Sequence, residues 1–160
     1  MIVAGLVVAL DQVSKWLISA NLSPGDRIEV LPGFLDLVFV RNPGAAFGIL
    51  AGQTAVIISI SVVGLIAVFF FLRRFPPTDV LGAHAFALIV GGTVGNLIDR
   101  IGPPHYVVDF LSFYVRGIFA WPAFNVADTA ITVGVFALIY HFYRSGAFSR
   151  THGQDDRPGD

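Results

Sequence analysis

Four long apolar stretches constrain this chain more than any other feature of its sequence. Each is close to the roughly 20 residues that an α-helix needs to cross the hydrocarbon core of a bilayer. The stretches cover residues 1–20, 52–72, 80–98 and 125–143. The second contains no charged residue, and the third holds Gly91 and Gly95 at a spacing that lets two helices approach closely. We therefore predict an all-α membrane protein with four transmembrane helices.

The charge content agrees with a surface that mostly faces lipid. Only 13% of the 160 residues are charged, whereas soluble domains carry about 25%. The net charge of −1 gives no reason to expect a nucleic-acid partner. With no cysteine, the chain has no disulfides and no thiolate nucleophile. The four histidines, at positions 84, 105, 141 and 152, lack metal-ligand spacing, so we expect neither a metal centre nor a cofactor.

The first apolar stretch could be mistaken for a cleavable signal peptide. It lacks a basic leading segment and contains Asp11 and Lys15, and no convincing cleavage site of small residues follows it. We therefore predict a retained helix. Because the stretch begins at Met1 itself, we expect that an N-terminal cytoplasmic segment is missing.

Arginines beside the spans predict the orientation of the chain in the membrane, because cytoplasmic loops are enriched in basic residues. Two lie in the short linker 73–79 and two follow the fourth span: Arg73, Arg74, Arg144 and Arg150. Both termini are then cytoplasmic, and the loops 21–51 and 100–124 lie outside. We predict one membrane-embedded domain over residues 1–144, followed by a polar, disordered cytoplasmic tail over 145–160.

The two outer loops carry patterns typical of short strands. Residues 27–41 are rich in β-branched and aromatic residues and are interrupted by Pro32 and Gly33. Residues 106–120 are similar, with a turn expected at Arg116 and Gly117. We predict a small sheet on the outer membrane face. An interfacial helix is the alternative for apolar runs of this length.

Charged residues within the spans are costly, at about 2.5–3.5 kcal/mol each on insertion scales, and therefore indicate function by default. Asp11 and Lys15 lie one helical turn apart and can pair. Such a pair is either a structural lock between helices or a group that orders an active site. Asn96, Asp99 and Arg100 close the third span, where they could also be ordinary residues of a helix end.

Two further polar residues, Asn125 and Asp128, open the fourth span. Asn125 alone is explained as a helix N-cap, but Asp128 has apolar neighbours in the sequence. Asp109 lies nineteen residues earlier on the same outer side, in the apolar segment VVDFL, unless it is only a surface carboxylate. If Asp109 and Asp128 converge, they cannot both ionise easily. One could activate water while the other polarises a carbonyl, which is peptide hydrolysis without a metal.

Five sequence blocks together resemble the lipoprotein signal peptidases, or type II signal peptidases. The blocks are LDQVSKW (10–16), RNPGAAFGIL (41–50), GGTVGNLIDR (91–100), VVDFL (107–111) and FNVADTAI (124–131). Their order and spacing fit the family over nearly the whole predicted domain. One difference is the absence of the basic leader that usually precedes the first helix.

The resemblance implies an intramembrane aspartyl endopeptidase of the bacterial cytoplasmic membrane. It would cut prolipoproteins just before the lipid-modified cysteine of the lipobox, near the outer leaflet, and globomycin-type antibiotics would inhibit it. The family fold adds a small β-cradle outside the membrane. The catalytic pair falls on Asp109 and Asp128. The supporting polar positions are Asp11, Lys15, Asn42, Asn96, Asp99, Arg100 and Asn125.

Two other functions remain as alternatives. A small proton- or cation-coupled transporter would use the same intramembrane aspartates, but its acids would be spread across the bilayer as a relay. A scaffold subunit without catalytic activity would tolerate neutralisation of Asp109 and Asp128. The motif set favours the protease.

Overall fold

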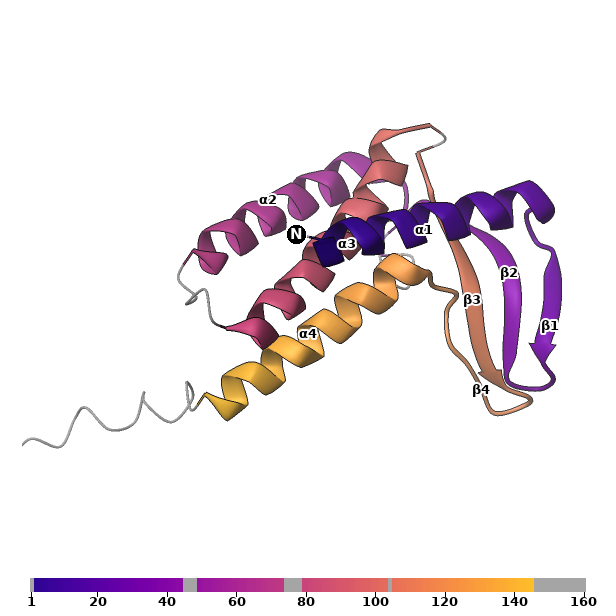
Figure 1. Cartoon of the computed structure of the whole chain (residues 1–160). Coiled ribbons are helices and arrows are strands. Elements are labelled where there is room, and N and C mark those ends of the chain that lie inside the picture. Colours follow the sequence, from indigo (N-terminus) through magenta and orange to yellow (C-terminus); the bar gives the residue numbers. More distant parts are fainter. Residues whose placement is uncertain (1, 45–48, 74–78, 104, 146–160) are drawn as a thin grey trace, which may run out of the picture.

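A computed structural model of the chain describes residues 2–44, 49–73, 79–103 and 105–145. Four helices are long and apolar enough to cross a membrane: α1 (Ile2–Asn21), α2 (Thr54–Leu72), α3 (Val80–Ile101) and α4 (Val126–Arg144) (Figure 1). The four predicted spans are therefore confirmed. The predicted tail, beyond its first residue, and most of the predicted linker between α2 and α3 lie outside the described residues.

One boundary was placed too early, because α3 continues through Arg100 to Ile101 and ends at Gly102. The sequence-based boundary assigned Arg100 to an outer loop. The guanidinium group of Arg100 instead donates back to the carbonyl oxygen of Asn96, one turn earlier (Nη1–O 2.9 Å). This bond allows a buried arginine to stay within the last turn of the helix.

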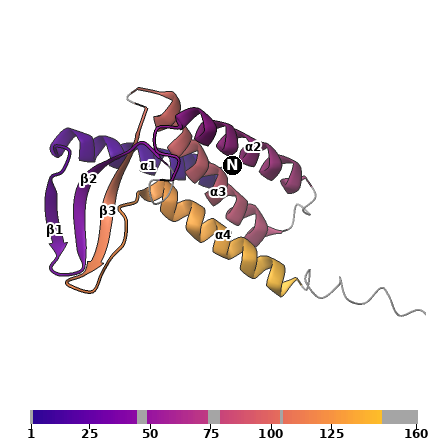
Figure 2. The same cartoon turned by 180° about the vertical axis from the view of Figure 1, so that it is seen from behind.

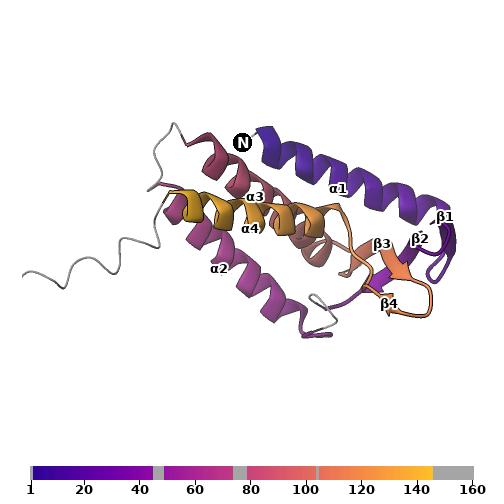
Figure 3. The same ribbon diagram turned by 90° about the horizontal axis from the view of Figure 1, so that it is seen from below.

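The third helix is the centre of the bundle and contacts each of the other three (Figure 3). Its glycines make this possible. A Cβ atom on Gly95 would lie 2.6 Å from a carboxylate oxygen of Asp11 in α1, and one on Gly92 would overlap the carbonyl oxygen of Ala127 in α4. Any larger side chain would therefore separate the helices. The small residues bring three helices together at the level where the polar residues lie.

The second helix differs from the other three. It contains no charged or buried polar residue, and Ile57 is its one buried residue. It packs on α3, and its Phe71 ring lies near Phe86 of α3 and Phe142 of α4. The remaining apolar side chains point outward, as expected for a helix that faces lipid.

A small antiparallel sheet adjoins one end of the helix bundle (Figure 2). Its order is β1 (Arg27–Leu31), β2 (Leu35–Asn42), β3 (Val107–Val115) and β4 (Phe119–Ala120). Both predicted turns are present, with Gly33 and Gly117 in the left-handed region at φ +79° and +76°, where glycine is favoured. The predicted strands are confirmed, and the alternative of an interfacial helix is wrong.

Candidate active site

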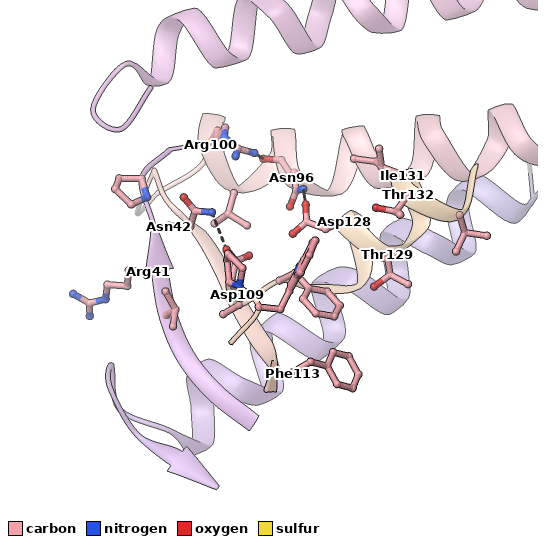
Figure 4. A pocket seen from close by; sticks show the side chains of 18 of the residues that line it. Arg41, Asn42, Asn96, Arg100, Asp109, Phe113, Asp128, Thr129, Ile131 and Thr132 are labelled. Atoms are coloured by element: carbon pink, nitrogen blue, oxygen red, sulfur yellow. Dashed lines mark hydrogen bonds between the residues drawn. The ribbon is translucent and has the colours of Figure 1, made fainter. Parts of the chain in front are cut away.

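A pocket of about 1050 Å³ opens where the sheet meets the C-terminal end of α3 and the N-terminal end of α4 (Figure 4). Five polar side chains gather at one part of it: Asn42, Asn96, Arg100, Asp109 and Asp128. Much of the remaining wall is apolar and comes from the sheet, the segment before α4, and α4 itself: Phe113, Phe119, Trp121, Phe124, Ile131 and Val133. The pocket thus combines a compact polar end with an apolar wall that continues along a membrane-spanning helix.

Strand β3 and helix α4 bring the two predicted catalytic aspartates into this pocket. Asp109 lies in β3 opposite Val40 of β2, on the strand face that also presents Val107 and Phe113 to the pocket. Asp128 lies in the first turn of α4. Its backbone N–H donates to the side chain of Asn125, and its own carboxylate accepts from the Asn125 backbone, which forms a capping box. Local helix capping therefore fixes the position of Asp128.

The carboxyl group of Asp109 is held by two amide side chains. Asn42 donates to its Oδ2 atom (2.8 Å) and Asn125 donates to its Oδ1 atom (2.7 Å). Asp109 is only 2% exposed. Burial raises the pKa of Asp109 to about 6, and the nearby charge of Asp128 adds to this, although the hydrogen bond from Asn42 opposes it. A carboxyl group with such a pKa exchanges a proton close to neutral pH.

The two aspartates are linked through Asn96 and Asn125. Asn96 donates to Asp128 (Nδ2–Oδ1 2.8 Å), and Asn125 donates to the Oδ1 atom of Asn96 (3.2 Å) as well as to Asp109. Asn125 is fully buried. The predicted N-cap role of Asn125 is confirmed, but the same side chain also connects the two aspartates. The same side chain therefore caps α4 and holds the site together.

The predicted pair of Asp11 and Lys15 is present behind the pocket. The ammonium group of Lys15 contacts Asp11 (2.7 Å) and Asp99 (2.6 Å) and also donates to Asn96 (3.0 Å). Asp11 accepts the backbone N–H of Ala127 with its other oxygen (2.9 Å). The ion pair therefore locks α1 against α3 and α4, and it also contacts the hydrogen-bond network of the site.

Arg100 joins the pocket to the segment after β2. It is 9% exposed, and its guanidinium donates to the backbone carbonyls of Asn96 (2.9 Å) and Gly44 (2.8 Å). All nine polar positions predicted from the sequence thus fall within one connected region. Asn42, Asn96, Arg100 and the two aspartates reach the pocket, while Asn125, Asp11, Lys15 and Asp99 support it from behind.

Two contributors to the fold around the site were missed from the sequence. Gln12 donates to Asp99 (2.9 Å), to Asp11 and to the Gly95 carbonyl, which adds a further connection between α1 and α3. A glutamine inside an apolar span was the available signal. Asp36 of β2, fully buried, was also overlooked. It accepts from Arg27 and Tyr114 on the sheet.

The aromatic side chains of the sheet and the adjoining segments lie in several different places. Phe113, Phe119 and Trp121 line the pocket. Phe39 and Phe110 are buried in the sheet, whereas Phe34 is half exposed. Tyr114 binds Asp36, and Phe47 lies outside the described residues. Among the residues described, no three acidic or histidine side chains come together as metal ligands would.

Comparison with known proteins shows the family to which the chain belongs. The family Peptidase_A8, described as signal peptidase (SPase) II, matches residues 3–144. The chain belongs to the signal peptidase II family. It is 45% identical over 149 residues to the lipoprotein signal peptidase of Syntrophotalea carbinolica, with 91% of each chain covered. It is 42% identical over 140 residues to that of Moorella thermoacetica, covering 88% and 89%.

Solved structures agree with this assignment of the signal peptidase II family. One bacterial membrane enzyme, determined by the in meso method at 2.3 Å resolution, superposes with a TM-score of 0.83 at 33% identity, and 99% of this chain and 93% of that one are covered. A second, determined at 1.9 Å, gives 0.77 at 35% identity, with 88% and 90% covered. The chain is therefore a protease of the bacterial inner membrane, with four apolar helices and a small sheet.

Proposed function

We propose that this chain cleaves prolipoproteins immediately before the diacylglyceryl-modified cysteine, with Asp109 and Asp128 activating the attacking water. The observation that carries the proposal is the pairing of two aspartates through neutral amides at the polar end of an otherwise apolar pocket. Two carboxyl groups that share one proton hydrolyse a peptide bond without a nucleophilic side chain. Membership of the signal peptidase II family supplies the substrate class.

The surroundings of the two aspartates suggest different roles. Asp128 lies at the positive end of the α4 helix dipole and accepts from Asn96. We assign Asp128 as the ionised general base that takes a proton from water. Asp109, buried and with a pKa of about 6, is the member that holds the shared proton. It donates that proton toward the carbonyl oxygen as the tetrahedral intermediate forms.

Breakdown of the intermediate then reverses these roles. The C–N bond breaks, and the amine of the lipidated cysteine leaves after receiving the proton that Asp128 took from water. The carbonyl re-forms, and the proton on its oxygen returns to Asp109. Both carboxyl groups thus regain their starting states, so the reaction consumes only water.

The apolar part of the pocket suits a lipidated substrate. The wall formed by Ile131 and Val133 belongs to α4, whose exposed residues face lipid, so a signal peptide and acyl chains can enter from the bilayer. Phe113, Phe119 and Trp121 would then contact the segment that carries the scissile bond. A globomycin-type cyclic peptide would compete for the same pocket. The orientation follows from the arginines: termini in the cytoplasm and the pocket near the outer leaflet.

The transporter alternative predicts acids distributed along a path through the bilayer. Asp11, Asp99, Asp109 and Asp128 instead belong to one hydrogen-bonded region beside the sheet. Their clustering at one level favours local proton exchange within a reaction over transport across the membrane.

The test uses the purified full chain and a synthetic precursor peptide with a diacylglyceryl cysteine. Mass spectrometry of the products is expected to show one cut directly before the modified cysteine, with activity unchanged by a chelator. The Asp128→Asn variant is expected to lose at least 10³-fold in kcat, within the range of acid–base catalysis. Full cleavage by that variant, or chelator inhibition reversed by a divalent metal, would overturn the mechanism. Failure of the wild-type chain to cut the peptide would overturn the proposed substrate assignment.

A further inference from the structure

Lys15 is a buried cation that the proposed chemistry leaves unused. Its side chain is 5% exposed and lies in α1, behind the pocket wall. It contacts Asp11, Asp99 and Asn96 but neither aspartate of the pair. Two anions would be enough to hold a lysine in place. The third contact, with the amide oxygen of Asn96, connects the cation to the site.

That contact fixes the direction of the hydrogen bonds that follow. A lysine ammonium has three donors and no acceptor, so Asn96 must turn its carbonyl oxygen toward Lys15. The NH₂ group of Asn96 then points the other way and donates to Asp128. Without a fixed donor, the two ends of an asparagine amide are nearly interchangeable in shape. Lys15 removes that freedom.

The amide of Asn125 is oriented independently of Lys15. Its Oδ1 atom accepts the backbone N–H of Asp128 (2.9 Å), so its NH₂ group must donate to the Asn96 oxygen and to Asp109. The oxygen of Asn96 thus receives two donors, one from Lys15 and one from Asn125. With both donors on its oxygen, Asn96 has only its NH₂ group left to face Asp128.

Reversal of the Asn96 amide would change the chemistry of the pair. Its oxygen would then face the carboxylate of Asp128, and two acceptors repel each other unless a proton lies between them. Asp128 would have to take the shared proton and could no longer act as the base. The orientation of Asn96 therefore decides which aspartate accepts the proton of the attacking water.

We propose that Lys15 is a positioning residue which, through Asn96, keeps Asp128 as the ionised member of the pair. The inference rests on the proposed function, because it concerns the roles of the two aspartates in that reaction. The competing explanation is that Lys15 only neutralises Asp11 and Asp99 and thereby holds the helices together. The two explanations differ in their effect on the pH profile.

The experiment compares a double variant that keeps the local net charge of the wild type with a single variant that keeps Lys15. The triad of Lys15, Asp11 and Asp99 has a net charge of −1. The double variant Lys15→Met with Asp99→Asn keeps that net charge, since Asp11 alone remains ionised, and thus limits the folding penalty of uncompensated buried anions. Asp99→Asn alone removes one partner of Lys15 but leaves the contact between Lys15 and Asn96. It is the control for the loss of Asp99, and the wild-type chain is the control of equal net charge.

The double variant is expected to lose about tenfold to 100-fold in kcat, as outer partners of an active residue typically cause, with KM within about twofold. Its kcat/KM profile should move by about one pH unit relative to the wild-type chain, which has the same local net charge. The protonated member of the pair can be identified by the infrared band of its carboxylic acid. In the double variant this band should disappear when Asp128→Asn is added, because the proton is then on Asp128. In the otherwise wild-type chain it should disappear with Asp109→Asn.

Three results would overturn the proposal. One is a double variant whose kcat equals that of Asp99→Asn and whose pH profile superposes on that of the wild-type chain. The second is a loss of activity with an unchanged pH profile and an unchanged infrared assignment, which would mean that Lys15 is only structural. The third is a double variant that does not fold while Asp99→Asn does, since Lys15 would then be needed for the bundle itself. Cleavage by the wild-type chain in the same assay shows that the proposed function holds independently.

Discussion

Two buried aspartates on neighbouring strands have opposite surroundings. Asp36 of β2 and Asp109 of β3 are 0% and 2% exposed. Asp36 contacts the guanidinium group of Arg27 and accepts from the Tyr114 hydroxyl at 3.1 Å, and the Arg27 group also lies over the Tyr114 ring. Asp109 is held by the neutral amides of Asn42 and Asn125 and faces the pocket.

The difference shows what makes a buried carboxylate available for chemistry. At Asp36 a cation supplies both hydrogen bonding and opposite charge, and the hydrogen bond to Asp36 raises the pKa of Arg27 above its ordinary value. At Asp109 the amides satisfy the oxygen atoms, but burial still raises the pKa to about 6. Asp36 therefore has a structural role on the sheet, whereas Asp109 can exchange a proton near neutral pH.

The largest expected contrast between the two positions is in catalysis. Asp109→Asn is expected to reduce kcat on the lipidated precursor peptide by at least about 10³-fold, since an amide cannot donate the shared proton. Asp36→Asn should stay within about threefold of wild type, because Asp36 lies outside the pocket. Single-turnover cleavage of both purified variants measures the contrast. Comparable losses at the two positions would remove the distinction drawn here.

The next effect is on stability and runs against the usual direction for an acid. The pKa of Asp109 is raised from an ordinary value near 3.8 to about 6 in the folded chain. The folded state therefore binds more protons between these values, and this group's contribution to stability falls as pH rises from about 4 to 6. The total is about 3 kcal/mol for two pKa units.

Asp109→Asn should remove this decline. Thermal unfolding in detergent is measured from about pH 4 to 7 for wild type and variant. The difference between them isolates the contribution of Asp109 to stability, because most other acids titrate alike in both proteins. The variant should become the more stable of the two toward neutral pH. Parallel curves would show that Asp109 titrates normally.

A smaller effect is expected at Asp36. Asp36→Asn should lower the free energy of unfolding by about 1–2 kcal/mol, because a buried charge-assisted hydrogen bond is replaced by a neutral one. Chemical unfolding in mixed micelles provides the measurement. A gain in stability would mean that Asp36 is a strained acid like Asp109.

The sequence could not have separated these two aspartates. Both occupy the same local pattern, an aspartate between apolar residues, in LDL at 35–37 and in VDF at 108–110. Only strand pairing and side-chain contacts distinguish them, because they place Arg27 and Tyr114 beside one and Asn42 and Asn125 beside the other. Resemblance to the family named Asp109 and not Asp36, and Asp109 lines the pocket.

The four spans, the strands and the glycine contacts of α3 were predictable because each depends on local pattern. The direction of the amide network was not, since Lys15 and Asn96 are 81 residues apart. The double role of Asn125 was hidden for a similar reason. Its capping function is readable from the next turn of helix, but its bonds to Asn96 and Asp109 require α3, β3 and α4 to meet.

The smallest expected effect is on the pH dependence of kcat/KM. If Asp109 must hold a proton, kcat/KM of the free enzyme should fall above about pH 6, by tenfold per pH unit. Bound substrate excludes water from the pocket, so the corresponding fall in kcat should occur at higher pH. Asp36→Asn should give the wild-type profile, because Asp36 exchanges no proton in the reaction. A flat kcat/KM profile from about pH 5 to 8 would assign the proton to another group and make Asp109 as inert as Asp36.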